Sequence, residues 1–253
     1  MRAIILAAGQ GRRLQAANPD GRPKCLIEIG GKTLLHRQLA ALFAKGVRRA
    51  DLVIGFEADR IIEHVSELSV RPEVSFHYNA RFELGSMLSL GCAGPALTSG
   101  APVLLMDADV IFHPAILDAL IHSNHGNCFL LDRAYTSGDE PVKIAVAGGT
   151  IVEFRKSLAS GLVYDTIGES VGFFRFEPAC AAALMGRCQE YEAEGRDDAP
   201  HEEVLRDLLL AQPQSFGYED ITGLPWVELD FSEDILRAEQ QVLPAIHRDL
   251  PGY

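Results

Sequence analysis

A run of small residues, LAAGQGRRL at positions 6–14, directly follows the first apolar segment of the chain. Small side chains let backbone N–H groups approach a ligand, and glycine tolerates the backbone angles of a tight phosphate-holding turn. The run is not the dinucleotide fingerprint, which needs a third glycine where Leu14 stands, and no Gly-Lys-Ser/Thr of a Walker loop follows. We expect a loop that binds a phosphate or a base, with an ordinary tight turn as the alternative.

Basic residues gather beside this loop in a chain that is acidic overall. The formal net charge is −12 at pH 7, which argues against nonspecific binding to nucleic acid or to an anionic membrane surface. An anionic substrate would therefore need a local basic cluster. One is present within thirteen positions, comprising Arg12, Arg13, Arg22 and Lys24. Solvated surface charges are the alternative interpretation.

Carboxylates follow a second apolar run, Val103 to Met106. Asp107 and Asp109 stand at its carboxyl end, two residues apart and so on the same face of a strand. Carboxylates in such a place suit Mg²⁺, which binds one or two protein carboxylates together with substrate phosphates and water. A further carboxylate, Asp230, ends the run W-x-E-x-D just before a helix that Ser232 could cap. A helix cap or a strand-end turn is the alternative for both Asp109 and Asp230.

The elements that must position these residues alternate between strand and helix in the first half of the chain. Strands are predicted at 3–7, 52–56, 74–78 and 103–106, with helices at 34–45, 60–68 and 87–97 between them. Such alternation is typical of a doubly wound, mostly parallel sheet of the Rossmann type.

After about residue 126 the predicted strands come closer together, at 128–132, 143–146, 151–154 and 170–176. Helices at 179–194 and 202–210, a strand at 227–230 and a last helix at 232–242 follow. No Pro/Gly-rich linker separates two domains. We expect one α/β domain over residues 1–253, with one half at about 1–125 and a smaller β-rich lobe at about 126–253.

Together these motifs resemble the nucleotidyltransferases that act on sugar phosphates and phosphocholine. The resemblance rests on L-A-A-G-x-G-x-R-L followed by Arg22-Pro23-Lys24-Cys25-Leu26. It implies that Arg13 and Lys24 are catalytic, holding the triphosphate and stabilising charge at the reacting phosphorus. It also implies Mg²⁺ as cofactor, with Asp109 and Asp230 as its ligands. On this basis the half at about 1–125 is expected to bind the nucleotide and the lobe at about 126–253 the acceptor. Many members carry Ser or Thr where this chain has Arg12, so a charged contact would replace a hydroxyl contact.

The stretch from Tyr78 to Leu90 resembles cytidylyltransferases for phosphocholine and aminoalkylphosphonates more than sugar-phosphate enzymes. The resemblance implies CTP as the donor. Asn79 offers a donor and an acceptor to a pyrimidine edge, and Ser86 could contact base or sugar; an Asx turn and a helix start are the alternatives. The predicted nucleotide-binding residues are Leu6, Ala7, Ala8, Gly9, Gly11, Arg12, Asn79, Ser86 and Asp107.

Acceptor-binding candidates lie in the second half. Lys143 and Lys156 stand where the family places lysines near phosphates, and simple solvation is the alternative for both. Glu169, Glu202 and Glu203 could face a cationic head group, which would also favour aromatic faces. Four aromatic residues are available for that purpose: Tyr135, Tyr164, Phe173 and Trp226.

Other function classes have less support. The five cysteines and eight histidines show no metal-binding or nucleophile spacing, and His201 is interpreted as structural or surface. Alternatives that stay open are a sugar-1-phosphate nucleotidyltransferase, a metal-dependent glycosyltransferase, and a noncatalytic nucleotide-sensing module. We expect a cytoplasmic protein without membrane insertion or a nucleic-acid partner, whose partners are a nucleoside triphosphate and a small phosphorylated acceptor. Assembly into a homo-oligomer stays open.

Overall fold

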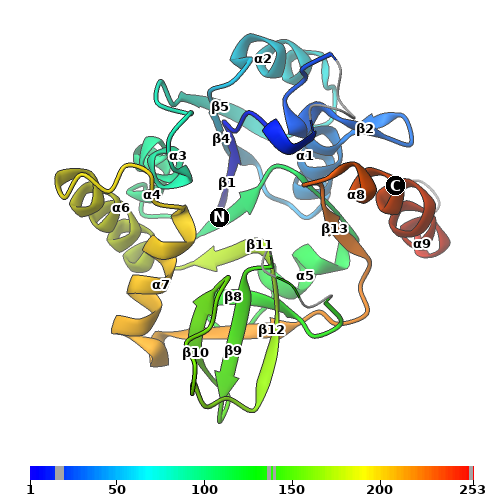
Figure 1. Ribbon diagram of the computed structural model, residues 1–253. Helices are drawn as coiled ribbons and strands as arrows, with labels where there is room; N and C mark the ends of the chain where they lie inside the picture. Colours follow the sequence, from blue (N-terminus) through cyan, green and yellow to red (C-terminus); the bar gives the residue numbers. More distant parts are fainter. Residues whose placement is uncertain (15–19, 136–137, 139–140, 251–252) are drawn as a thin grey trace.

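The first strand, β1 (Arg2–Ala7), lies between β4 (Arg49–Ile54) and β6 (Val103–Asp107) and pairs with both in parallel. Next to β4 lies β5 (Glu73–Tyr78), also parallel (Figure 1). The structure is a computed structural model that describes residues 1–14, 20–135, 138, 141–250 and 253. The parallel sheet predicted from the alternating segments of the first half is therefore confirmed.

Alternating side chains along β1 divide the core into two layers. Ile5 packs with α1 (Leu34–Ala44), α2 (Ala58–Glu67) and α5 (Ala115–Ile121) on one face of the sheet. Ile4 packs on the other face with α3 (Ser86–Cys92), α4 (Gly94–Leu97), α6 (Pro178–Ala193) and α7 (His201–Ala211) (Figure 1). Both isoleucines are fully buried because both faces of the strand are covered by helices.

The strands of the second half extend the same sheet. β11 (Thr166–Phe176) pairs antiparallel with β6 and also with β8 (Asn127–Asp132) and β9 (Lys143–Ala147). β10 (Thr150–Arg155) continues from β9, and β12 (Phe216–Asp220) pairs with β8. In the described part of the chain this gives a nine-stranded sheet. The α/β fold class is confirmed, whereas the division near residue 125 stays a prediction.

Several short elements were not predicted. β2 (Glu28–Ile29) and β3 (Lys32–Thr33) form a hairpin, and β7 (Val110–Phe112) pairs antiparallel with β13 (Trp226–Glu228). Three 3₁₀ turns are η1 (Arg12–Leu14), η2 (Lys24–Leu26) and η3 (Pro213–Ser215). The predicted helix at 87–97 is two helices, because Pro95 stands in the first turn of a new one.

The predicted last helix at 232–242 is helical throughout but is not one continuous α-helix. α8 (Ser232–Arg237) passes into a π-helical turn (Ala238–Val242) and then α9 (Leu243–Asp249). The first turn of α8 is stabilised by the Asp234 carboxylate, which accepts hydrogen bonds from the backbone N–H groups of Asp230 and Phe231 at 2.9 and 2.7 Å. The sequence suggested Ser232 as the cap of this helix, but Asp234 accepts the hydrogen bonds at its start. Among the described residues no helix combines the length and apolar character needed to cross a membrane.

Candidate active site

Carboxylates from two distant segments meet at the carboxyl edge of the parallel strands. β6 ends at Asp107, and Asp109 follows in the turn to β7. The antiparallel pairing of β13 with β7 brings the last part of the chain to this turn, and the Leu229 N–H donates to the Asp109 carbonyl at 2.9 Å. Glu228 and Asp230 consequently lie beside Asp109.

Three of these carboxylates are placed to share one cation. One oxygen each from Asp109, Glu228 and Asp230 lies within 4.8 Å of the others. Mg²⁺ is usually held by a few carboxylates together with substrate phosphates and water, so these three groups would supply the protein's share of its ligands. Carboxylate oxygens are also the hard donors that this ion prefers. The residues therefore fit a divalent cation.

Glu228 was not among the predicted site residues. The signal was present, since positions 226, 228 and 230 alternate onto one side of an extended segment. Burial raises the pKa of Glu228 well above its usual range, and the charges of Asp109 and Asp230 add to that effect. A crowded carboxylate of this kind gains most from a neighbouring cation.

Lys24 supplies a cation to this cluster. Its ammonium donates to Asp230 Oδ1 at 2.6 Å and to Asp109 Oδ2 at 3.1 Å. Burial opposes the charge of Lys24, but the two carboxylates outweigh burial and raise the pKa of the ammonium above its usual range. The turn at Gly11 permits this approach, because a Cβ there would lie 2.7 Å from Lys24 Cγ.

Arg13 lies at the edge of the same cluster. Its guanidinium is 3.7 Å from Asp230 Oδ2 and stands over the Phe231 ring, 5.5 Å from the centroid. Its neighbour Arg12 instead donates to the Gln10 side chain. The two predicted catalytic residues, Arg13 and Lys24, are thus brought together with the two predicted metal ligands.

A pocket opens between the loop after β1 and the start of α3. Its lining includes five of the predicted nucleotide-binding residues, Leu6, Ala8, Gly9, Ser86 and Asp107. Ala7 is buried in β1. Asn79 lies behind the pocket, where its amide group donates to Ser89 Oγ at 3.0 Å and its carbonyl oxygen accepts from the Arg81 N–H at 2.8 Å. The asparagine therefore shapes the loop that leads into α3.

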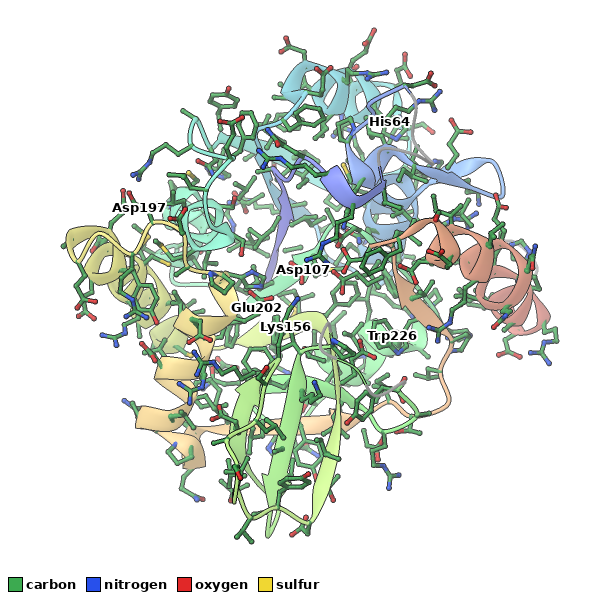
Figure 2. All side chains as sticks on the ribbon, in the orientation of Figure 1. His64, Asp107, Lys156, Asp197, Glu202 and Trp226 are labelled. Carbon is green, nitrogen blue, oxygen red and sulfur yellow. The ribbon has the colours of Figure 1, made fainter. Side chains whose placement is uncertain are left out.

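His201 and Glu202 reach the same pocket from the amino-terminal end of α7. His201 is buried there and is not a surface residue, and no spacing in the sequence connected it with Ser86, its partner at 3.1 Å. Asp107, Glu202 and Lys156 converge on the centre of the molecule from three elements and line one further recess (Figure 2). Two predicted acceptor residues are thus adjacent to the nucleotide pocket.

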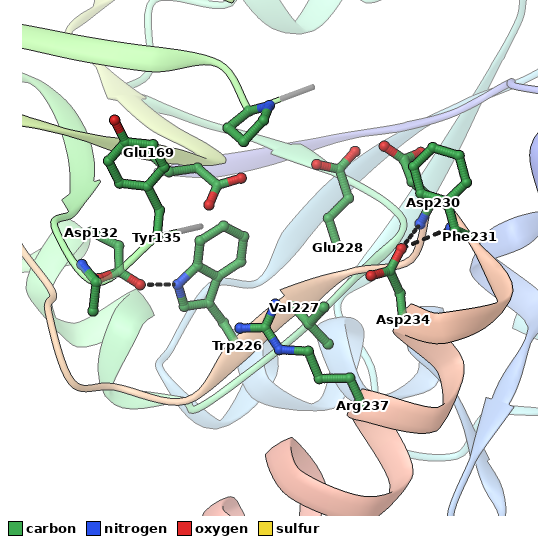
Figure 3. Close-up of a pocket in the computed structure, with 12 residues that line it drawn as sticks. Asp132, Tyr135, Glu169, Trp226, Val227, Glu228, Asp230, Phe231, Asp234 and Arg237 are labelled. Atoms are coloured by element: carbon green, nitrogen blue, oxygen red, sulfur yellow. Dashed lines mark hydrogen bonds between the residues drawn. The ribbon is translucent and has the colours of Figure 1, made fainter. Parts of the chain in front are cut away.

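A second pocket lies on the other side of the carboxylate cluster. Figure 3 shows Tyr135, Glu169 and Trp226 around it, with Arg237 entering from α8. The Trp226 indole N–H donates to Asp132 Oδ2 at 2.8 Å, which fixes the ring. Burial raises the pKa of Glu169 to about 7, and the charge of Asp132 adds to the effect. The charges of Arg237 and Lys143 lower this pKa, but less than burial raises it. The pocket therefore combines aromatic faces with a carboxylate and a guanidinium.

Other predicted acceptor residues are engaged elsewhere. The Lys143 ammonium donates to the carbonyls of Gly138 and Lys156 at 2.7 and 2.6 Å. Glu203 pairs with Arg155 at 2.8 and 3.2 Å. Phe173 packs in the core, edge to face with Phe112, so it does not line the pocket.

A glycine-containing loop after the first strand of a parallel sheet, facing a lysine and a carboxylate cluster, defines an α/β nucleotidyltransferase fold. The chain belongs to the family described as MobA-like NTP transferase domain, which matches residues 3–162. This membership favours nucleotidyl transfer over the glycosyltransferase and sensor alternatives.

Individual relatives agree with that assignment. The chain is 27% identical over 244 residues to the bifunctional IPC transferase and DIPP synthase of Rubrobacter xylanophilus, covering 95% of this chain and 52% of that protein. It is 22% identical over 256 residues to the CTP:phosphoglutamine cytidylyltransferase of Campylobacter jejuni, covering 93% and 98%. The chain thus spans about half of the first relative and nearly all of the second.

Solved structures share the fold. The inositol-1-phosphate CTP transferase of T. maritima superposes with a TM-score of 0.76 at 21% identity, covering 97% of this chain and 96% of that one. The CTP:phosphocholine cytidylyltransferase of Streptococcus pneumoniae superposes with a TM-score of 0.71 at 18% identity, covering 94% and 97%. At these identities the likeness establishes the fold alone.

Proposed function

We propose that the protein is a Mg²⁺-dependent cytidylyltransferase that transfers CMP from CTP to a small phosphorylated acceptor. The observation that carries this proposal is the position of Lys24, Asp109, Glu228 and Asp230 between two pockets. One pocket has the small-residue loop expected to hold a nucleotide. The other has room and charge for an acceptor, so the two substrates would meet at the carboxylate cluster.

In the proposed reaction an acceptor phosphate oxygen attacks the α-phosphorus of CTP, and the bond from that phosphorus to the bridging oxygen breaks. Pyrophosphate leaves with the bonding electrons. The attacking oxygen is already anionic, so no general base is needed, and positioning and charge neutralisation supply most of the rate. Lys24 and Arg13 would stabilise the charge on the phosphates. Mg²⁺ would supply further neutralisation when held by Asp109, Asp230 and Glu228.

Two observations support CTP as the donor. The stretch from Tyr78 to Leu90 has the cytidylyltransferase pattern, and its Ser86 lines the nucleotide pocket. The relative from Campylobacter jejuni, which matches nearly the whole chain, is a CTP:phosphoglutamine cytidylyltransferase.

For the acceptor we propose a phosphate or phosphonate with an ammonium group. Tyr135 and Trp226 offer aromatic faces, which attract a cation, and Glu169 offers a carboxylate on the same pocket. Sugar hydroxyls would offer this carboxylate hydrogen bonds but no positive charge.

A substrate panel tests the proposal. With Mg²⁺ and CTP, phosphocholine or 2-aminoethylphosphonate is expected to release pyrophosphate faster than glucose 1-phosphate or inositol 1-phosphate. The same acceptors should be slower with ATP, GTP or UTP. A preference for glucose 1-phosphate or inositol 1-phosphate, which have no ammonium group, would contradict the proposed acceptor but leave cytidylyl transfer intact. No pyrophosphate from any combination would contradict the proposed function.

Replacing Glu169 with glutamine should raise KM for a cationic acceptor and leave KM for CTP nearly unchanged, because only the acceptor loses a charge partner. The Glu169 carboxyl, with its pKa of about 7, is mostly neutral at pH 6 and mostly ionised at pH 8. KM for the acceptor should therefore fall as the pH rises from 6 to 8 in the wild type and change less in the variant.

Stability provides the control for Glu169. A carboxyl whose folded-state pKa exceeds its unfolded value contributes stability below the unfolded pKa, and this is lost as the pH rises through about 7. Glu169→Gln should therefore melt at the wild-type temperature or higher at pH 8. An acceptor KM that does not change in this variant would remove Glu169 from the acceptor site.

A further inference from the structure

The Asp107 carboxylate is enclosed by two groups from the second half of the chain. Gly172 of β11 has φ +77°, and a Cβ there would lie 2.3 Å from Asp107 Oδ2. The other oxygen, Oδ1, faces His201 Nε2 at 3.8 Å. That separation is less than one ångström longer than the donor–acceptor distance of a hydrogen bond. The orientation of Asp107 therefore depends on residues outside its own half.

His201 is only 4% exposed, and its two ring nitrogens have different surroundings. Nδ1 lies 3.1 Å from Ser86 Oγ and 3.2 Å from Glu202 Oε2. Nε2 is buried and has no hydrogen-bond partner among the described residues. Buried polar atoms in native proteins nearly always have a partner, so an exception that lines a ligand pocket points to a contact made when the ligand binds.

The backbone at His201 is held firmly against the start of α3. The His201 N–H donates to Ser86 Oγ at 2.9 Å, and the N–H groups of Gly85 and Met87 donate to the carbonyls of Asp197 and Ala199 at 2.9 and 3.1 Å. These two segments are so close that a Cβ at Gly85 would lie 2.2 Å from the Ala199 carbonyl oxygen. The backbone that carries the imidazole is thus held close to Asp107.

We propose that His201 is a positioning residue, which donates a hydrogen bond from Nε2–H to Asp107 when the nucleotide occupies its pocket and so directs the carboxylate at the nucleotide. The inference rests on the proposed function and deepens it. It assigns part of the nucleotide site to α7, an element of the half expected to bind the acceptor. Loss of the bond should weaken nucleotide binding while leaving the phosphate-binding groups in place.

Two amide substitutions separate the two ring nitrogens. Glutamine can place its amide N–H near Nε2, whereas asparagine can place it only near Nδ1. His201→Gln should keep KM for CTP within about threefold of the wild type, and His201→Asn and His201→Phe should raise it about tenfold or more. The dissociation constant of CDP, measured by calorimetry without acceptor, should change in the same order, with kcat affected less than KM.

A coupling measurement tests whether Asp107 is the partner. In an Asp107→Ala background, adding His201→Phe should raise the dissociation constant of CDP by less than twofold, because the group on which His201 acts is gone. If the dissociation constant of CDP in the double variant rises by the product of the two single-variant increases, the proposal is overturned. Near-normal binding by His201→Asn with a loss in His201→Gln would also overturn it, since the role would then be the Ser86 contact.

The exposed His122, outside the pockets, provides the matched control, and His122→Gln should retain the wild-type KM and dissociation constant. Equal CDP affinity in all three His201 variants, whether normal or weakened, would overturn the proposal. Thermal unfolding of each variant identifies any general loss of the fold. If the wild type releases no pyrophosphate from CTP with any acceptor, the proposed function fails, while the CDP series still decides the role of His201.

Discussion

Replacing Asp109 with asparagine is expected to lower the rate of pyrophosphate release at least about a hundredfold while leaving the fold intact. The side chain stands at a turn beside Glu228 and Asp230, where we expect it to contribute negative charge to a bound cation. Steady-state rates at saturating CTP and Mg²⁺, with circular dichroism of both proteins, measure the two parts of this expectation.

Metal binding can also be followed without turnover. Mg²⁺ should raise the thermal midpoint of the wild type, because it binds the folded state, and should do so much less in Asp109→Asn. Asp230→Asn should behave alike, whereas Glu228→Gln should mainly increase the Mg²⁺ concentration needed. Asp59→Asn, on the exposed start of α2, is the matched control. An Asp109→Asn protein with the wild-type rate and the wild-type response to Mg²⁺ would remove the metal from this site.

Substitution of Lys24 by methionine should lower turnover about a hundredfold or more, since a charge aimed at the phosphates is lost and groups of this type contribute two to three orders of magnitude. Its effect on stability should depend on the metal. Without Mg²⁺, Asp109 and Asp230 lose the ammonium that lies between them, so the variant should melt at a lower temperature than the wild type. Added Mg²⁺ should then stabilise the variant more than the wild type.

Lys45→Met is the control for this substitution, because Lys45 pairs with Asp118 away from both pockets. It should keep the wild-type rate and the wild-type response to Mg²⁺. If Lys24→Met unfolds more easily with and without Mg²⁺ but turns over normally, Lys24 is a structural cation and not a catalytic one.

The sequence predicted the parallel sheet well because alternating apolar strands and amphipathic helices are local signals. It also singled out Lys24, Asp109 and Asp230, which meet although Lys24 and Asp230 are 206 positions apart. Local sequence patterns do not show that residues so far apart in the chain lie together. The resemblance to a known family indicated that they do. The roles assigned to these residues remain predictions until the variants are measured.

What the sequence did not predict depends on partners that only the fold provides. The alternation of positions 226, 228 and 230 indicated the side on which Glu228 lies, but not its neighbours. Glu228 joins the cluster because β13 pairs with β7, a three-residue strand too short to be predicted from periodicity. Lys143 and Glu203 were candidates by position, but the carbonyls near Lys143 and the guanidinium of Arg155 engage them. Tyr135 and Trp226 share a pocket whereas Phe173 is in the core, a difference that no spacing of aromatic residues indicates.

The pairing of β13 with β7 also has a consequence for biosynthesis. A ribosome must add more than a hundred residues after Asp109 before Glu228 and Asp230 exist, and the strand that carries them must then close a long loop. A nascent chain that has folded only its first half would hold the loop after β1 and one aspartate of the cluster. Such a chain would be unable to assemble the cation site, so turnover would begin only once synthesis has passed Asp230 and β13 has docked.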